Sequence, residues 1–290
     1  MNQDRQAILF GLGAVALWST VATAFKVALA WMSPLELMWL AALVSWALMG
    51  ALVIKQGNIA TALRTGWKTA AWAGLMNPVA YYLVLFAAYD RLPGQEAMAL
   101  NYTWALAMAF LAVPLLGQRL TRMDIVAGLV AYVGVWVIAT RGAVFNVSFA
   151  DPLGVVLALA STLLWALYWL LNARDSRPPL VGQWQNFSVG LPVLTLLLLL
   201  GPGYQWHGWP AFGAGVYVGL FEMGVAFILW QLAMHKVSRT AKVSNLIFLS
   251  PPVSLLLLFL VVGEPILPST LIGLVLILLG LGLQQAQKNE

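Results

Sequence analysis

The 290-residue chain has no cysteine and very few charged residues. Without cysteine there are no disulfides, no haem-attachment motif and no thiolate metal site. Charged residues make up 9% of the chain, whereas a soluble domain averages roughly 25%. With 62% hydrophobic residues, a soluble fold would expose larger apolar patches than solubility allows. The composition therefore excludes a soluble enzyme, a nucleic-acid binder and a disordered protein, and it predicts an integral membrane protein.

Motifs for metal, nucleotide and nucleic-acid chemistry are also missing. Only His207 and His235 could supply imidazole, and no HExxH, CxxC or paired-acid motif occurs. No GxxxxGK[ST] loop is present, so we expect no cofactor and no direct use of ATP. The basic residues are scattered, which argues against a nucleic-acid partner despite the net charge of +5.

Long apolar runs dominate the chain. A membrane helix needs roughly 20 mostly apolar residues, whereas the strands of a membrane barrel are about half that length. The runs predict an all-α membrane protein with ten transmembrane helices and the lipid bilayer as its surroundings. The predicted spans are 6–26, 34–54, 68–89, 94–115, 123–140, 153–173, 180–200, 210–234, 240–262 and 269–285.

Basic residues in the connections predict the orientation of the chain. If the N-terminus is cytoplasmic, 12 of the 15 Lys and Arg residues face the cytoplasm. Only Lys26, Arg91 and Arg141 then lie on the other side. Because cytoplasmic loops are enriched in Lys and Arg, both termini are predicted to be cytoplasmic.

Several short motifs recur at a near-constant offset of 145–147 residues. The matching runs are Ala16-Leu17-Trp18 with Leu163-Leu164-Trp165, and Leu75-Met76-Asn77 with Leu220-Phe221-Glu222. They predict two five-helix repeats, at 1–141 and 152–290, joined by a periplasmic connection at 142–151. Since five is odd, the second copy is inverted, as in many secondary transporters. The alternative is that apolar helices resemble one another by chance.

Further motifs carry a resemblance to a known family. They are Ser250-Pro251-Pro252, Gly263-Glu264-Pro265, Gly273, Gly117-Gln118-Arg119-Leu120-Thr121 and Gly128. On these residues the chain resembles the drug/metabolite transporter (DMT) superfamily with two EamA-type halves. The first half departs from the family pattern at two places. Gln118 stands where Glu is common, and Trp104-Ala105 stands where the pattern has a proline. The length and aromatic content are most similar to bacterial YddG-type exporters of aromatic amino acids. That resemblance implies the bacterial inner membrane and export of amino acids to the periplasm.

Glu222 is the only acid predicted near the middle of a span. It lies roughly 18 Å along a helix that crosses a core of roughly 30 Å. The small residues Gly215, Gly219 and Ala226 share its predicted face and suit the interior of a helix bundle. Glu222 could therefore bind a substrate ammonium or exchange a proton. The alternative is a protonated structural glutamate that hydrogen-bonds to a neighbouring helix.

Asn77 occupies the position in the first repeat that Glu222 occupies in the second. Pro78 follows it and should free a backbone carbonyl by interrupting the helix. Tyr81 lies one helical turn after Asn77, so both are predicted on one face. Loosened helices often bind substrate in transporters, although a kink with an interhelical hydrogen bond is the alternative.

Aromatic residues supply further candidates for a binding site. Trp18 and Trp165 lie at equivalent depths in the two repeats, and Trp169 follows Trp165 by one turn. Such rings could form the walls of an aromatic site or contact an ammonium group, and core or lipid-facing packing is the alternative.

Span 94–115 carries Asn101 and Trp104, three residues apart on one predicted face. Both are further candidates for substrate contact. Pro251 and Pro252 should bend span 240–262, with or without a ligand nearby.

Together these features predict a secondary active exporter of amino acids, with aromatic ones preferred, that alternates access around a midplane cavity. A related exporter could carry another metabolite or a lipophilic drug. A nucleotide sugar would need cations for its phosphates, and no Lys or Arg is predicted at mid-depth. An intramembrane enzyme would need a reactive pair, such as a nucleophile beside a base. The sequence offers no obvious partner with which Glu222 could form such a pair. A passive channel is the remaining alternative.

Overall fold

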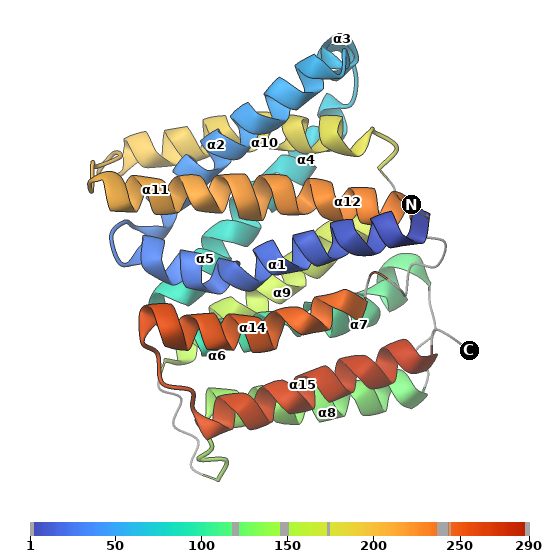
Figure 1. Cartoon of the computed structure of the whole chain (residues 1–290), viewed down its shortest axis with the longest axis vertical. Coiled ribbons are helices and arrows are strands. Elements are labelled where there is room, and N and C mark those ends of the chain that lie inside the picture. Colours follow the sequence, from blue (N-terminus) through green and yellow to red (C-terminus); the bar gives the residue numbers. More distant parts are fainter. Residues whose placement is uncertain are drawn as a thin grey trace. The chain divides into compact units, whose positions relative to one another are not determined.

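The computed structural model describes residues 3–117, 122–145, 151–172, 175–236, 243 and 245–287. All regular structure in those ranges is helical and none of it is strand, as Figure 1 shows. The helical class predicted from the apolar runs is thus confirmed. Gln118, Arg119, Leu120 and Thr121 of the first-half motif lie outside the described residues.

In the part of the chain that the structure describes, seven helical runs are long and apolar enough to cross a membrane. They are Gln3–Leu29, Pro34–Lys55, Trp67–Arg91, Gly94–Leu115, Pro152–Asn172, Pro179–Leu200 and Trp209–Trp230. Three shorter apolar helices are Ile125–Ile138, Ser250–Val262 and Pro268–Leu283. The chain is therefore a multi-pass membrane protein. The count of ten crossings and the side on which the termini lie stay predictions.

Contacts divide the chain into two compact units. The first unit is Met1–Phe86 with Asp175–Ser254, and the second is Ala87–Arg174 with Leu255–Glu290. Each unit therefore contains segments from both predicted repeats.

The first unit holds both spans that carry Asn77 and Glu222. Its elements are α1 (Gln3–Leu29), α2 (Pro34–Lys55), α3 (Ile59–Arg64), α4 (Trp67–Gly74), the π-helix η1 (Leu75–Ala80), α10 (Pro179–Leu200), α11 (Trp209–Tyr217), the π-helix η2 (Val218–Val225), α12 (Ala226–Lys236) and the 3₁₀-helix η3 (Asn245–Leu249). The second unit contains α6 (Gly94–Asn101), α7 (Trp104–Leu116), α8 (Arg122–Ala139), α9 (Pro152–Asn172), the π-helix η4 (Leu258–Val262) and α15 (Pro268–Gln287). Two helices, α5 (Tyr81–Arg91) and α14 (Ser250–Leu257), contribute residues to both units.

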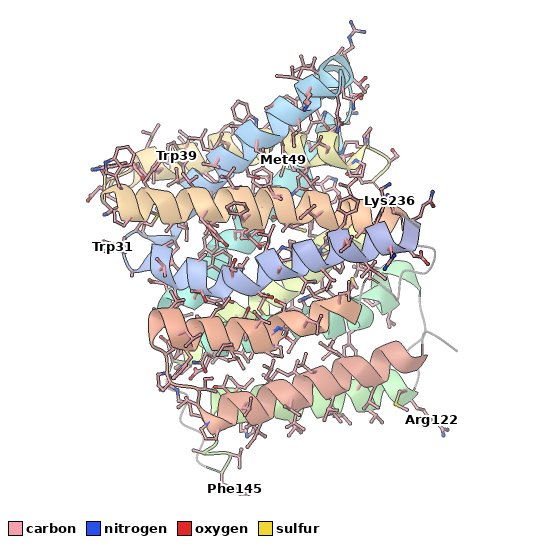
Figure 2. All side chains as sticks on the ribbon, in the orientation of Figure 1. Trp31, Trp39, Met49, Arg122, Phe145 and Lys236 are labelled. Carbon is pink, nitrogen blue, oxygen red and sulfur yellow. The ribbon has the colours of Figure 1, made fainter. Side chains whose placement is uncertain are left out.

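An antiparallel pair of helices, α2 and α10, forms the support of the first unit. The Trp39 Nε1–H donates to Thr195 Oγ1 at 2.9 Å. The Trp46 Nε1–H donates to Ser188 Oγ at 2.8 Å. Figure 2 labels Trp39, the first of these donors. The numbers of the two tryptophans rise along α2, while the numbers of their acceptors fall along α10. The two helices therefore run in opposite directions.

Each interrupted span packs on one helix of this pair through a glycine. A Cβ at Gly219 would lie 2.6 Å from the Ala41 carbonyl oxygen and 2.8 Å from Val44 Cβ on α2. A Cβ at Gly74 would likewise meet the Asn186 carbonyl oxygen, and would lie 3.0 Å from Val189 Cβ, on α10. All three residues of the second contact differ from those of the first by 145 positions.

Small residues also set the packing of the second unit. α8 lies against α15, and in Figure 2 Arg122 marks the start of α8 while Phe145 lies beyond its last residue, Ala139. A Cβ at Gly134 would lie 2.5 Å from the Gly273 carbonyl oxygen, and one at Gly280 would lie 2.6 Å from that of Ala127. Such glycines let two membrane helices approach to backbone contact.

Candidate functional site

Within the described residues, four helical runs are interrupted partway along their length. In the first unit, η1 separates α4 from α5 and η2 separates α11 from α12, while η3 precedes α14. In the second unit, residues 102–103 form a turn between α6 and α7. The runs α1, α2, α8, α9, α10 and α15 are continuous α-helices. Interruptions matter in a membrane because they leave backbone groups outside the regular hydrogen-bond ladder, where transporters use them to bind cargo.

Glu222 lies within η2, with only 9% of its surface exposed. The Tyr82 hydroxyl donates to Glu222 Oε1 at 3.2 Å. Glu222 Oε2 is buried and has no hydrogen-bond partner among the described residues. The carboxylate is therefore fixed through one oxygen and open at the other. A buried group in this state is normally satisfied by a ligand, a proton or water.

Asn77 lies in the other interrupted span of the same unit. Its backbone is extended rather than helical, with φ of −140° and ψ of 112°, and 1% of its surface is exposed. Neither its Oδ1 nor its Nδ2 has a hydrogen-bond partner within the described part of the chain. Pro78 packs against α10, where a Cβ at Gly190 would lie 2.8 Å from Pro78 Cγ. The Asn77 side-chain amide is thus left without a described hydrogen-bond partner, in a segment that packs against α10.

Aromatic rings accompany both spans. Tyr82 contacts Tyr81 and Phe86 with ring centroids 4.7 and 5.5 Å apart. Trp18 of α1 contacts Phe227 and Trp230 of α12, at 5.9 and 5.1 Å. Trp18 therefore belongs to the aromatic packing between α1 and α12 in the first unit.

The remaining candidates lie in the second unit. The Asn101 amide donates to Ser161 Oγ at 3.0 Å, and Trp104 begins α7 directly after the turn. Trp165 contacts Trp169 at 5.6 Å along their shared helix. Asn101 thus links the interrupted span to α9.

Pro251 and Pro252 lie in the first turn of α14, directly after the 3₁₀ segment η3. Proline is tolerated there because the first N–H groups of a helix have no intrahelical acceptor. The change of helix type occurs just before the two prolines.

Tyr82 is a site residue that sequence reasoning missed. The search for a partner of Asn77 used the spacing of a regular α-helix, which pointed to Tyr81. Because residues 75–80 are not α-helical, the helical phase shifts and that spacing rule does not hold across them. A proline followed closely by two tyrosines was the only signal in the sequence.

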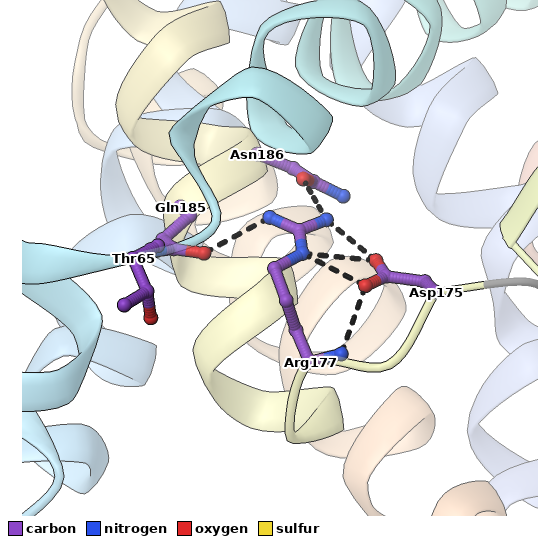
Figure 3. Close-up of polar contacts among 5 residues, drawn as sticks. All are labelled: Thr65, Asp175, Arg177, Gln185 and Asn186. Atoms are coloured by element: carbon purple, nitrogen blue, oxygen red, sulfur yellow. Dashed lines mark hydrogen bonds and ion pairs between the residues drawn. The ribbon is translucent and has the colours of Figure 1, made fainter.

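A buried polar cluster holds the loop that precedes α4, and Figure 3 shows it. The Gln185 amide donates to the carbonyl oxygens of Ala62 and Thr65, at 2.6 Å each. Arg177 donates to Gln185 Oε1 at 3.0 Å and to Asn186 Oδ1 at 2.9 Å, and it forms an ion pair with Asp175 at 2.6 Å. We call Asp175, Arg177, Gln185 and Asn186 the α10 clasp.

Electrostatics within the α10 clasp favour the ionised form of Asp175. Burial opposes that ionisation, but hydrogen bonds and the positive charge from Arg177 outweigh it. They hold the pKa of Asp175 below its ordinary value.

A second cluster holds the loop that precedes α11. Glu36, in the first turn of α2, accepts from the Gln205 backbone N–H at 3.0 Å and contacts His207 Nε2 at 3.0 Å. Its other oxygen accepts from the Ser33 backbone N–H at 2.9 Å and so caps α2. We call Ser33, Glu36, Gln205 and His207 the α2 clasp. Each helix of the α2–α10 pair thus binds, near its own N-terminus, the loop that follows the other helix.

Apolar spanning helices with buried polar groups at their interruptions define a membrane transporter architecture. The profile of the EamA-like transporter family matches residues 5–140 and 152–284. The chain belongs to this family, which confirms the resemblance expected from its motifs. It is therefore a transporter rather than an enzyme.

Named relatives come from several bacteria. The "Aromatic amino acid exporter YddG" of Ancylobacter novellus is 27% identical, over 89% of this chain and 88% of its own length. The "Probable terminal-alkyne amino-acid exporter" of Streptantibioticus cattleyicolor is 27% identical over 70% of this chain and 68% of its own. A solved crystal structure superposes with a TM-score of 0.69 at 24% identity, covering 97% of this chain and 96% of that one. This last likeness shows the fold alone.

Proposed function

We propose that this chain is a secondary active transporter that exports amino acids, aromatic ones preferred, across a bacterial inner membrane. Two relatives of this chain carry names of amino-acid exporters, which supports that cargo. The single observation that carries the proposal is Glu222, a buried carboxylate with one oxygen held by Tyr82 and the other unpartnered. In this role Glu222 binds the substrate ammonium or exchanges a proton, and Asn77 offers a neutral amide.

The proposed architecture has ten transmembrane helices, with both termini in the cytoplasm. It forms an inverted 5+5 repeat at 1–141 and 152–290, joined by 142–151. The recurrence of the Gly74 contact at Gly219, 145 residues later, supports this repeat. Alternating access about such a repeat exposes one site to the two sides in turn. In this scheme Trp18, Trp165 and Trp169 provide aromatic surfaces for the cargo.

Asn101 and Trp104 complete the proposed substrate contacts, together with Tyr81. Pro78, Pro251 and Pro252 mark the places where the spans depart from regular helix. No nucleotide, metal or ATPase partner takes part in this scheme.

Uptake of labelled phenylalanine into proteoliposomes, with and without an imposed pH gradient, tests the proposal. We expect uptake above empty liposomes, and we expect Glu222→Gln to lose it. Asp90→Asn is the matched control, because it makes the same chemical change at an exposed carboxylate at the end of α5. Uptake that responds to the gradient supports proton coupling, whereas uptake without counterflow indicates a channel. Absence of phenylalanine uptake in the wild-type protein would refute the proposed cargo.

A further inference from the structure

Glu222 has no cationic partner among the residues of its unit that the structure describes. Among the described residues, its carboxylate has one hydrogen bond, from Tyr82, and no ion pair. The runs Pro179–Leu200 and Trp209–Trp230 contain no Lys or Arg at all. In α1 and α2, the basic residues Arg5, Lys26 and Lys55 all lie within five residues of a helix end. Within the described part of the first unit, the Glu222 carboxylate therefore has no counter-charge.

A buried carboxylate without a counter-charge is unfavourable, and a bound cation removes that penalty. An ammonium group that donates to Glu222 Oε2 satisfies both the charge and the open hydrogen-bonding position. The ring of Tyr82, whose hydroxyl donates to Glu222, packs against Tyr81 and Phe86, so aromatic side chains lie close to the carboxylate and suit an aromatic group on the same ligand.

A carboxylate on the ligand meets a different environment. It adds a second negative charge to a region where Glu222 is already uncompensated. The unpartnered polar group on the other interrupted span, Asn77, is a neutral amide that donates through Nδ2 without contributing positive charge. The carboxylate of an amino acid is thus accommodated by hydrogen bonding, while its ammonium group supplies the charge balance.

We propose that the ammonium group is the obligatory recognition element of this site and that the carboxylate is dispensable. The cargo class therefore includes primary aromatic amines that have no carboxylate. This inference rests on the proposed function, since it specifies which part of the exported molecule the Glu222 site reads.

Displacement of labelled phenylalanine from the purified full-length protein in detergent micelles tests this inference. Micelles are used because the neutral form of an amine crosses liposome membranes unaided. The competitors are 2-phenylethylamine, which lacks the carboxylate, and 3-phenylpropanoate, which lacks the ammonium. We expect the amine to displace phenylalanine at a concentration roughly tenfold to a hundredfold lower than the acid, the factor expected for a hydrogen bond to a charged group.

Two variants separate charge recognition from general damage to the site. Glu222→Gln removes the charge and should abolish the preference for the amine over the acid. Tyr82→Phe keeps the carboxylate and removes only its hydrogen bond, so the preference should persist with weaker binding. If the acid displaces phenylalanine as well as the amine does in the wild-type protein, the inference is wrong whatever the variants do.

Failure of the proposed cargo can be told apart from failure of this inference. If labelled phenylalanine neither binds nor is transported, the amino-acid proposal fails. Thermal shifts of the same protein with each competitor then still decide the inference. Stabilisation by 2-phenylethylamine alone supports recognition of the ammonium, whereas stabilisation by 3-phenylpropanoate alone, or by neither compound, overturns it.

Discussion

The two interrupted spans of the first unit, α4–η1–α5 and α11–η2–α12, are held by similar contacts but carry different chemistry. Each packs on one helix of the α2–α10 pair through a glycine, Gly74 in one and Gly219 in the other. Each is preceded by a loop that the same helix clasps, through Gln185 or Glu36. Yet one span presents the amide of Asn77 and the other a carboxylate.

This comparison separates what the fold requires from what the cargo requires. Close helix contact needs the same small residue at both places, because any side chain there would meet backbone. The chemistry of the site has no such requirement and differs between the spans. A carboxylate in each span would place two uncompensated charges in one unit, so a single acid is the arrangement with the smaller electrostatic cost.

Moving the carboxylate from one span to the other should have the largest effect. Glu222→Gln should reduce phenylalanine uptake by about a hundredfold, because removing one member of a buried charge interaction costs about 2–5 kcal/mol. The double variant Asn77→Asp with Glu222→Gln should not recover it, because no described residue donates to the Asn77 side chain as Tyr82 donates to Glu222. Initial uptake rates in proteoliposomes, normalised to reconstituted protein, provide the measurement.

Asn77→Asp alone serves as the control for the double variant. It adds a second carboxylate to the unit and should raise the KM for phenylalanine while Glu222 is present. Recovery of half the wild-type rate in the double variant would mean that the two positions are interchangeable, and the contrast between the spans would then fail.

Substitutions that break the two clasps should have the next largest effect. Gln185→Leu should destabilise the protein by about 2–3 kcal/mol, because the buried Ala62 carbonyl loses its donor and the Thr65 carbonyl loses its bond to α10. Glu36→Gln retains an acceptor for the loop before α11 and should cost only about 1 kcal/mol. Thermal unfolding in detergent measures both variants.

Gln56→Leu makes the same substitution at an exposed position near the end of α2 and should leave unfolding unchanged. Equal destabilisation by Gln185→Leu and Glu36→Gln would contradict the greater dependence on the α10 clasp.

Gly74→Ala and Gly219→Ala test the feature that the two spans share, which is a close glycine contact with one helix of the α2–α10 pair. Each added methyl group meets a backbone oxygen, which can move little, so we expect each variant to lose about 1–3 kcal/mol of stability. Gly213→Ala is the control, because a Cβ there has open space around it. The same unfolding assay applies. A cost at one glycine and none at the other would remove the basis for treating the two spans as equivalent.

Much of the fold could be predicted because each membrane helix corresponds to one continuous apolar run in the sequence. Within the described residues the predicted spans fall on helical segments, with a turn at 102–103 inside span 94–115, and Gly215 and Gly219 near Glu222 lie against α2. The candidate site was harder, because it depends on departures from regular helix. The π-helical segments around Asn77 and Glu222 change the helical phase, so spacing rules pointed to Tyr81 and overlooked Tyr82.

The clasps could not be predicted for a different reason. Gln185 looks like an ordinary polar residue at the start of an apolar helix. Its acceptor, the Thr65 carbonyl, lies 120 residues earlier in the chain. Every residue has a backbone carbonyl. The residue that accepts from such a side chain therefore cannot be identified from its type in the sequence.

The smallest expected effect is a pH dependence that originates in the α10 clasp. Since Arg177 holds the pKa of Asp175 below its ordinary value of 3.8, ionised Asp175 stabilises the folded protein fully above that value. The stabilisation is lost as the pH falls from 3.8 toward the lower pKa of the folded state. Thermal unfolding in detergent between pH 5 and pH 3 should therefore show a loss of stability in the wild-type protein. Asp175→Asn should be less stable at pH 5 and should lose less on acidification. If both proteins lose the same stability over this range, the ion pair with Arg177 does not control the loop before α4.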